Sequence, residues 1–431
     1  MSAQRPLIHP RDELVDTLLR IYRYRMTTTS GGNLSILDEG GDLWITPARV
    51  DKGALRGEDI VRVGADGRSD GRHKPSSEYP FHRAIYAARP DVRAILHAHP
   101  VALVAFSTCR AMPNVAMFPQ AAHVCGTVAY AAYALPGSAA LGQAIAAAFA
   151  AGAACVMLEN HGVVVAGQNM AEAFARFETL EFCAKTQIKS HALGTARSLT
   201  PRQLARAAEF RATMTAFRPG PAGSGERDAR RQVVDFVRRG YRQRLMTSTE
   251  GTLSARVDGD AFVITPYGVD RATVDLDDLV LIRGDQVEEG KTPSRAAGVH
   301  RAIYRRHKSI RAIANGMPVN ASAFAVTGTT LETRTIPESY ILLRDVPTIP
   351  FDLRFDDPDA VADLVTPRRP VALIENDGVL VLGQSVLDAF DRLEVMESTA
   401  EALIHSRCIG PLCPMDDSAI RELAHAFPTA G

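Results

Sequence analysis

The stretch Ala94-Ile95-Leu96-His97-Ala98-His99-Pro100 places two histidines one residue apart at the end of an apolar run. The apolar run predicts a buried β-strand. Successive side chains of a strand point to opposite faces of the sheet, so His97 and His99 share one face. Two imidazoles side by side supply two of the three protein ligands of a catalytic divalent metal. The pair alone is explained equally well by packed or surface histidines, so the interpretation depends on further partners.

A third histidine lies further along the chain. Residues 154–165 have the pattern of strand, tight turn and strand, with Asn160, His161 and Gly162 in the turn. Glycine tolerates positive φ and asparagine favours turns, which predicts a hairpin here. Such a hairpin could bring His161 to the first two histidines.

A carboxylate precedes the histidine pair. Glu78 ends the segment Lys74-Pro75-Ser76-Ser77-Glu78, directly before a predicted helix over 79–89. Ser76 or Ser77 is expected to cap this helix, with Glu78 in its first turn. A lone carboxylate at a helix start usually serves the helix itself. Beside three histidines, a general base next to a metal becomes the better interpretation.

Five motifs, in this order, resemble the class II (metal-dependent) aldolase/adducin family, typified by fuculose-phosphate aldolase. They are Thr28–Ser35, Ile45–Pro47, Lys74–Glu78, His97–Pro100 and Glu159–Gly162. Each motif is weak alone, and their order and spacing carry the resemblance over about the first 210 residues. Short strands mixed with helices also favour an α/β sandwich with a mostly antiparallel sheet. The resemblance implies a three-layer α/β/α form of that sandwich.

The resemblance also implies roles for individual residues. The positions that match the family's zinc ligands are His97, His99 and His161, and Glu78 matches its catalytic acid/base. The positions that match its phosphate-binding donors are Gly32, Asn33, Thr46, Ser76 and Ser77. Backbone N–H groups of a Gly-rich turn and Ser/Thr hydroxyls suit an anion. Such a turn is common by itself, and family members that act on carboxylates keep much of it. A phosphate and a carboxylate therefore both remain candidate ligands of this loop.

Three neutral imidazoles leave a divalent metal with open positions, which is the catalytic pattern. We expect one metal per chain, Zn²⁺ first, with Mn²⁺, Fe²⁺ or Co²⁺ as alternatives. A keto and a hydroxyl oxygen of a substrate could then bind side by side, and an enediolate would be stabilised. The predicted function is therefore a metal-dependent lyase that cleaves a C–C bond of a small phosphorylated hydroxy-carbonyl compound, as an aldolase does. Loss of CO₂ from a keto or hydroxy acid is the alternative within the same chemistry.

One departure from the family affects the choice between these two reactions. Some aldolases of the family use a tyrosine about twenty residues after the His-x-His motif to help protonate the leaving fragment, and Phe118 stands there. Phenylalanine cannot donate a proton. His123 is nearby in sequence and is a candidate acid, although it could equally be a packed residue. Glu rather than Asp at position 78 argues against the related pentulose-phosphate epimerases.

Two further functions stay open. An adducin-like assembly or interaction protein would keep the fold without chemistry, but it has no use for three ligands and a base. The same three histidines could also hold iron for oxygen chemistry, and the identity of the metal separates that case, because zinc is redox-silent.

The pattern starts again in the second half of the chain, at an offset of 216 to 220 residues. The matching pairs are Met246–Ser254 with Met26–Ser35, Ile264–Pro266 with Ile45–Pro47, His300–Tyr304 with His82–Tyr86, and Glu375–Val379 with Glu159–Val163. Such self-similarity indicates a tandem duplication. We predict a catalytic domain over 1–216, a Pro/Gly/Ser-rich linker over 217–229 and a second copy over 230–431.

The two copies differ at the positions of the predicted metal ligands and the predicted acid/base. The histidine pair becomes Asn315-Gly316-Met317, His161 becomes Asp377, and Ser76-Ser77-Glu78 becomes Ser294-Arg295-Ala296. The second copy is therefore predicted to be non-catalytic and kept for assembly. Should it contribute to the first site, Arg295 and Tyr267 are the candidates.

Composition narrows the classes of partner that the protein is expected to bind. Lys plus Arg and Asp plus Glu are 49 each, so the net charge gives no reason to expect nucleic acid or an acidic membrane as partner. The six cysteines are scattered and form no CxxC motif, which predicts free thiols and a cytoplasmic protein. No signal-peptide pattern is seen at the N-terminus, and no stretch reads as a membrane span. Family members form tetramers, so the resemblance implies a homodimer or higher homo-oligomer, a pseudo-tetramer of domains.

Overall fold

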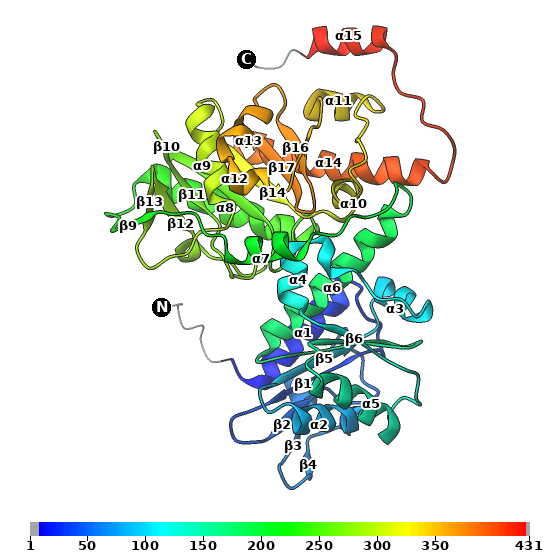
Figure 1. The fold of residues 1–431 in the computed structure, drawn as a ribbon. Coiled ribbons are helices and arrows are strands. Elements are labelled where there is room, and N and C mark those ends of the chain that lie inside the picture. Colours follow the sequence, from blue (N-terminus) through cyan, green and yellow to red (C-terminus); the bar gives the residue numbers. More distant parts are fainter. Residues whose placement is uncertain (1–7, 428–431) are drawn as a thin grey trace. The chain divides into compact units, whose positions relative to one another are not determined.

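A computed structural model describes residues 8–427 (Figure 1). The chain forms two compact units. The first consists of the chain up to Val115 together with Ala121–Lys185, and the second of Ala116–Gln120 together with the chain from Thr186 onward.

The first unit is built on an eight-stranded sheet of order β4-β3-β2-β1-β5-β8-β7-β6. Its strands are β1 (Asn33–Leu37), β2 (Leu43–Ile45), β3 (Val61–Val63), β4 (Ser69–Asp70), β5 (Ala94–Ala98), β6 (Val128–Ala131), β7 (Cys155–Leu158) and β8 (Gly162–Gly167). Neighbouring strands run antiparallel except the parallel pair β6 and β7. The expected mostly antiparallel sheet is confirmed, and the His-x-His strand lies at its centre.

Helices cover both faces of this sheet. The helices along this part of the chain are α1 (Pro10–Arg23), α2 (Tyr79–Ala88), α3 (Val101–Thr108), α4 (Pro119–Cys125), α5 (Ala139–Ala150) and α6 (Met170–Ser190), with the 3₁₀ turns η1 (Gly57–Asp59) and η2 (Val115–Met117). Most of η2, the start of α4 and the end of α6 belong to the second unit. In β5, Leu96 joins the apolar cluster that α1, α3 and α6 build, whereas Ile95 joins the cluster of α2 and α5. This alternation is what a strand buried on both faces requires. His97 lies on the same side as Ile95, and therefore faces α2.

The second unit repeats the plan with nine strands, in the order β15-β16-β17-β14-β10-β11-β12-β13-β9. They are β9 (Thr215–Phe217), β10 (Thr252–Asp258), β11 (Ala261–Ile264), β12 (Val280–Arg283), β13 (Gln286–Glu288), β14 (Ala312–Gly316), β15 (Thr348–Ile349), β16 (Val371–Ile374) and β17 (Gly378–Gly383). Its helices are α7 (Pro201–Glu209), α8 (Ser224–Arg242), η3 (Leu276–Asp278), α9 (Ala297–Arg306), α10 (Val319–Thr327), α11 (Pro337–Leu343), α12 (Leu353–Asp356), α13 (Pro358–Leu364), α14 (Val386–Ser406) and α15 (Asp417–Ala426). Two apolar clusters again lie on opposite faces of the sheet, so the tandem α/β sandwich is confirmed.

The duplication also includes buried hydrogen bonds at the starts of two helices, which belong to the fold and not to the predicted metal site. In the first unit the carboxylate of Glu181 accepts the N–H groups of Ala102 and Leu103 at the start of α3. In the second unit Glu397 accepts those of Asn320 and Ala321 at the start of α10. Each carboxylate satisfies orphan donors of a helix whose own N-cap is a proline.

Two local features differ from what the sequence pattern suggests. The apolar run from Val115 to Phe118 suits a strand, but the structure has the 3₁₀ turn η2 over Val115–Met117. The expected linker over 217–229 is irregular only between Phe217 and Ser224, where α8 begins. The Pro and Gly residues correctly indicate the loop, but Glu226 and Arg230 form an i,i+4 ion pair that belongs to the helix.

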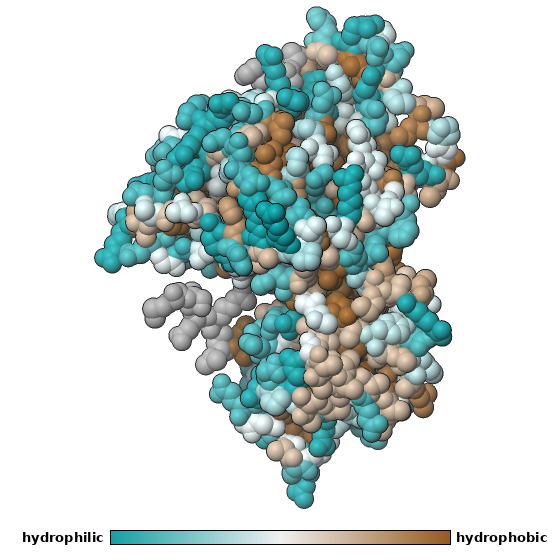
Figure 2. Space-filling view, in the orientation of Figure 1, coloured by the Kyte–Doolittle hydropathy of each residue, from teal (hydrophilic) through white to brown (hydrophobic). Residues whose placement is uncertain are grey.

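The surface has both hydrophilic and apolar areas. Figure 2 shows hydrophilic residues over much of the visible face, with a paler brown area where Figure 1 draws α5. The exposed side of α5 carries alanines, and Tyr133 and Leu135 just before it are 60% and 68% exposed. Among the helices that the structure describes, none is long and apolar enough to cross a membrane. All six cysteines are free, as expected.

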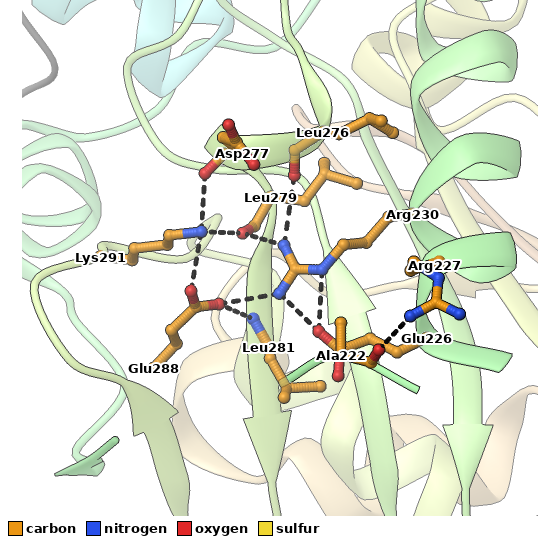
Figure 3. A network of polar contacts seen from close by, with 10 residues as sticks. All are labelled: Ala222, Glu226, Arg227, Arg230, Leu276, Asp277, Leu279, Leu281, Glu288 and Lys291. Atoms are coloured by element: carbon orange, nitrogen blue, oxygen red, sulfur yellow. Dashed lines mark hydrogen bonds and ion pairs between the residues drawn. The ribbon is translucent and has the colours of Figure 1, made fainter. Parts of the chain in front are cut away.

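A buried ionic network joins α8 to the β12–β13 hairpin (Figure 3). The guanidinium of Arg230 lies 2.8 Å from a carboxylate oxygen of Glu226 and 3.0 Å from one of Glu288. It also donates to the carbonyl of Leu279 at 2.8 Å. Lys291 contacts the other oxygen of Glu288 at 2.8 Å. Burial opposes ionisation of Glu288, but the hydrogen bonds from Lys291, Leu281 and Arg230 keep its pKa below the usual range.

Replacing Arg230 with methionine is expected to lower the free energy of opening of this hairpin by about 1–3 kcal/mol, because the buried carboxylate of Glu226 loses its partner. The half-buried Glu288 keeps Lys291 and the N–H of Leu281. Hydrogen exchange of the β12 amides measures this quantity. Arg231→Met is the control, since that side chain is 67% exposed and its loss should cost within about 0.5 kcal/mol. Because the pKa of Glu288 is lowered by folding, its stabilising contribution is present above its unfolded pKa and is lost as the pH falls through its folded pKa. Equal costs for the two variants would contradict a structural role of the network.

Candidate metal and acid–base site

Strand β5 fixes the first histidine. His97 is fully buried, and its Nδ1 lies 2.9 Å from the carbonyl oxygen of Val163 on β8. A carbonyl only accepts, so Nδ1 carries the proton and Nε2 is left as the free lone pair. A backbone partner of this kind orients histidines that bind metals.

The other two histidines converge on the same point. One ring nitrogen each from His97, His99 and His161 lies within 4.8 Å of the others. The Nε2 atoms of His97 and His99 are 3.0 Å apart, and all three pairs of ring centroids are 4.8 Å apart. In the described part of the chain this is the one group of three or more His, Cys, Asp or Glu side chains that meets the geometry of a metal site.

The turn that carries His161 differs in detail from the expectation. Asn160 adopts the positive φ, at 52°, and Gly162 does not. Glycine is required at 162 for another reason. A Cβ there would lie 2.6 Å from the carbonyl oxygen of Ala98 and 2.8 Å from the ring of His99. Gly162 thus lets the hairpin approach β5 closely enough for the histidines to meet.

Glu78 faces the three histidines from the start of α2. Its Oε2 lies 3.2 Å from Nε2 of His97, and its Oε1 lies 3.6 Å from Nε2 of His161. Glu78 occupies the N-cap position itself, and Ser76 accepts the backbone N–H of Glu78 rather than one inside the helix. The expected serine cap of α2 is therefore wrong, and the carboxylate is directed away from the helix toward the cluster.

The donor set fits a divalent cation. Burial lowers the pKa of His99 to about 3 and that of His161 to about 4, so both are neutral, as metal ligands must be. Oε1 of Glu78 is buried and has no hydrogen-bond partner. Burial alone would raise the pKa of Glu78, but the closeness of His97 and the hydrogen bond from Asn33 lower it, so the carboxylate is ionised. A carboxylate with a free lone pair beside three imidazoles is suited to accept a proton.

A chain of hydrogen bonds runs from Glu78 into the core. Asn33 donates its amide to Oε2 of Glu78 at 2.7 Å, and its amide oxygen lies 2.5 Å from Nε2 of His82. Nδ1 of His82 lies 2.7 Å from the hydroxyl of Ser35, which lies 2.8 Å from that of Tyr86. Burial lowers the pKa of His82 to about 3, so the ring is neutral. Its Nε2–H therefore donates to Asn33, and the orientation of the Asn33 amide toward Glu78 is fixed.

The residues predicted to bind phosphate have different surroundings. The side chain of Asn33 is engaged by Glu78 and His82, and the hydroxyl of Thr46 accepts the N–H of Leu34 at 3.1 Å inside the sheet. Ser77 is exposed. Gly32 has a φ of 76°, and a Cβ there would lie 2.9 Å from the carbonyl oxygen of His97. The loop thus lies directly against the histidine strand, and its role toward phosphate stays a prediction.

The two residues near the expected aldolase tyrosine lie in contrasting environments. Phe118 is 1% exposed. His123 is exposed on α4, and the structure shows no hydrogen bond or ion pair between it and the three histidines or Glu78. Its role as an acid stays a prediction that the structure does not support.

Sequence reasoning missed the hydrogen-bonded core behind Glu78. The signal was present, because His82-Arg83-Ala84-Ile85-Tyr86 recurs unchanged at 300–304. In the second unit His300 again joins a serine hydroxyl, that of Ser254 at 2.8 Å, and its other nitrogen lies 2.7 Å from Asn315. The repeated pentapeptide therefore marks a framework common to both copies rather than the site of one.

Comparison with known proteins identifies the family. The sequence pattern described as Class II Aldolase and Adducin N-terminal domain matches residues 12–188 and again residues 231–404. The chain belongs to the class II aldolase and adducin family. The two matches together span most of the chain, and they confirm the tandem duplication.

The class II aldolase chain is similar to several named enzymes over less than half of its length. A 3-oxo-tetronate 4-phosphate decarboxylase from Pectobacterium atrosepticum is 35% identical over 179 residues, which are 41% of this chain and 82% of the relative. A 5-methylthioribulose-1-phosphate/5-deoxyribulose-1-phosphate aldolase from Rhodospirillum rubrum is 35% identical over 164 residues, 37% of this chain and 72% of the relative. A solved L-fuculose 1-phosphate aldolase is 31% identical and matches 46% of this chain and 94% of its own, with a TM-score of 0.42.

His82 and His300 occupy equivalent positions in the two copies, so they give a matched test of the chain of hydrogen bonds that runs from Glu78 into the core. Alanine at either position leaves buried hydrogen-bonding groups without a partner and is expected to cost about 1–3 kcal/mol of opening free energy in its own unit. Only His82→Ala is expected to lower turnover, by about 10–100-fold, because it removes the support of the residue that orients Glu78. Hydrogen exchange in each unit and kcat below the melting transition measure the two effects. Equal losses of kcat in both variants would show that the effect is one of stability alone.

Proposed function

We propose that the first unit is a metal-dependent carbon–carbon lyase acting on a small phosphorylated hydroxy-carbonyl compound. The observation that carries this proposal is the convergence of three imidazole nitrogens on one point with the carboxylate of Glu78 facing them. The names of the relatives support the reaction class, since they are aldolases and a decarboxylase.

His97, His99 and His161 would hold the metal. Zinc is the first choice for three imidazoles, with manganese, iron or cobalt as alternatives. When bound, a divalent cation supplies Lewis acidity toward a carbonyl oxygen of the substrate. Glu78 would take up the proton released from the hydroxyl next to the scissile bond, or return one to the resulting carbon. Asn33 and His82 hold its carboxylate in place for this transfer.

The loop at Gly32 is the proposed phosphate subsite, together with Asn33, Thr46, Ser76 and Ser77. Two of these side chains are already engaged inside the protein, so backbone N–H groups and the exposed Ser77 are the donors left for an anion. The start of α2 adds the positive end of a helix dipole.

Decarboxylation is the second candidate, and one observation favours it. Phe118 is buried and cannot give or take a proton, and His123 is exposed and takes no part in the ion pairs and hydrogen bonds that join the described histidines and Glu78. Aldol cleavage needs one group that takes the proton from the hydroxyl that becomes the aldehyde and a proton for the enediolate carbon, whereas loss of CO₂ needs only the proton for that carbon. Both reactions use the same proposed residues.

A substrate panel tests the proposed function. The metal-loaded protein is incubated with 3-oxo-tetronate 4-phosphate, 5-deoxyribulose 1-phosphate and fuculose 1-phosphate, while released CO₂ and released aldehyde are measured separately. Turnover of any of the three is expected, and the product distinguishes the two candidates. Absence of both products with zinc, manganese, iron and cobalt in a folded, metal-containing protein would favour the adducin-like interaction protein instead.

We also propose that the second copy, residues 230–431, is non-catalytic, that it follows the catalytic domain of residues 1–216, and that the chain works in the cytoplasm. Asn315, Met317 and Asp377 stand where the first copy has its histidines. The six free cysteines support a reducing compartment.

The chain is expected to form a homodimer or a higher even assembly. Exposed apolar residues in the first unit, among them Val101, Tyr133 and Leu135, support an interface, and the brown area of Figure 2 lies around α5. Light scattering coupled to gel filtration measures the mass. A sharp peak at the monomer mass over a wide range of protein concentration would contradict this assembly.

A further inference from the structure

The second unit contains a pocket where the first has its histidine cluster. It is formed by the loop before β10, the end of β14, the start of α9, and α12, and it has a cavity volume of about 60 Å³. That is several times the space of about 10–15 Å³ that a single water requires. Asn315, Met317 and Asp377, which replace the three histidines, are all part of its lining.

Three arginines line this pocket. They are Arg271, Arg295 and Arg354. Arg271 is 3% exposed, and its Nε donates to the carbonyl of Gly251 at 2.7 Å. Its counterpart in the first copy is Lys52, because the backbone N–H of each donates to the equivalent carbonyl, of Ser248 and of Thr29. Arg295 replaces Ser77, and Arg354 is contributed by α12.

The charges in the pocket do not balance. Glu250 lies 2.7 Å from Arg295, and Asp377 forms an ion pair with Arg354. Arg271 bonds to carbonyl oxygens instead, so the lining has three arginines and two carboxylates. Outside the lining, Asp270 and Asp352 act on Arg271 and Arg354 through their charge. Nε of Arg354 is buried without a hydrogen-bond partner. Burial, and next the charge of Arg295, lower the pKa of Arg354 to about 9, which leaves it charged at neutral pH.

Hydroxyl groups and a helix start complete the lining. Thr252 and Ser294 share a hydrogen bond of 2.5 Å, and Ala296, the N-cap residue of α9, provides no side-chain cap. The ten-residue helix therefore presents its positive end without a capping side chain. Tyr267 and its neighbouring arginine Arg295 form one wall, with the guanidinium 5.6 Å from the ring centroid.

We infer that this pocket is a binding site for the phosphate group of a small molecule, formed without metal. The second copy has none of the three histidines that stand here in the first copy. Its pocket instead has three guanidinium groups around hydroxyls and the start of a helix. Guanidinium groups bind phosphate oxygens with paired, charge-assisted hydrogen bonds. Arg295 and Tyr267 thus serve the second copy's own pocket, and the inference does not depend on lyase activity in the first unit.

Hydrogen exchange of the full chain tests the inference, because it reports on each copy separately. Inorganic phosphate, glycerol 3-phosphate and chloride at matched ionic strength are the probes. Phosphate or its ester is expected to slow exchange in residues 247–254 and 292–299, where chloride does not. Protection by glycerol 3-phosphate alone would show that the ligand is an organic phosphate. Protection by both glycerol 3-phosphate and inorganic phosphate would show that the site binds the phosphate group itself.

Variants with opposite expected signs separate binding from structure. Arg295→Gln removes a donor and should weaken phosphate binding about tenfold or more. Glu250→Gln frees the same arginine from its carboxylate and should strengthen binding. Arg301→Gln, on α9 and paired with Asp285 outside the pocket lining, should leave the affinity unchanged.

Two results would overturn the inference. One is the absence of phosphate-dependent protection in 247–254 and 292–299 of the folded wild-type chain. The other is an affinity that changes in the same direction in Arg295→Gln and Glu250→Gln. Both are independent of exchange in residues 28–35 and 74–81, which reports on the proposed phosphate subsite of the first copy.

Discussion

Replacing Glu78 with glutamine is expected to lower kcat by about 10²–10⁴-fold while the metal content stays unchanged. The amide keeps the shape of the side chain and can still bond to Asn33, but it cannot take up a proton. The carboxylate is 3.2 Å from His97 and one of its oxygens is free, so its loss acts on proton transfer rather than on folding. Steady-state kinetics on the best substrate of the panel measure the effect.

The control for this variant is Glu58→Gln. Glu58 is a half-exposed carboxylate of the same unit that pairs with Arg72, and its replacement should leave kcat within about twofold. A Glu78→Gln enzyme that retains its rate would exclude Glu78 as the acid/base. An enzyme that loses both rate and metal would instead make Glu78 a ligand.

The double variant His97→Ala/His99→Ala is expected to lose the metal, about one per chain in the wild type, and with it all measurable turnover. Two of three ligands are removed, and one imidazole cannot hold a divalent ion against the buffer. Inductively coupled plasma mass spectrometry of the purified proteins measures the content and identifies the metal. Zinc, manganese or cobalt would be consistent with a lyase, whereas iron with oxygen-dependent turnover would indicate oxygen chemistry.

Asn315→Ala/Met317→Ala is the matched control in the second copy and should retain the metal. Two metals per chain in the wild type would show that the second copy binds one as well. Metal that persists in the histidine variant at full occupancy would place the ligands elsewhere.

Much of this protein could be predicted from sequence because its signals are local. The His-x-His pattern on a strand determines that His97 and His99 share a face, whatever the rest of the chain does. The recurrence of whole motifs at an offset of 216 to 220 residues determines the duplication. The loss of ligands in the second copy is also visible from the sequence alone. The family's α/β sandwich followed from these motifs.

Other features depend on contacts between distant segments. That Gly162 is needed for close approach to Ala98, rather than for a positive φ, becomes visible only when β8 lies beside β5. The orientation of the Asn33 amide toward Glu78 depends on His82, which is 49 residues from Asn33 in sequence. Residues 115–117 form a 3₁₀ turn although the apolar character of 115–118 suits a strand equally well.

The sequence by itself determined which residues could bind a metal, that the chain is duplicated, and that the second copy lacks those residues. Periodicity and residue chemistry are local properties and can be read along the chain. Only the tertiary structure decided that the second copy is not an empty remnant. Arg271, Arg295 and Arg354 come from three separate segments and meet only in the folded unit, around a pocket that the lost histidines no longer occupy. Charges that are scattered in sequence act together only when folding removes the distance and the water between them.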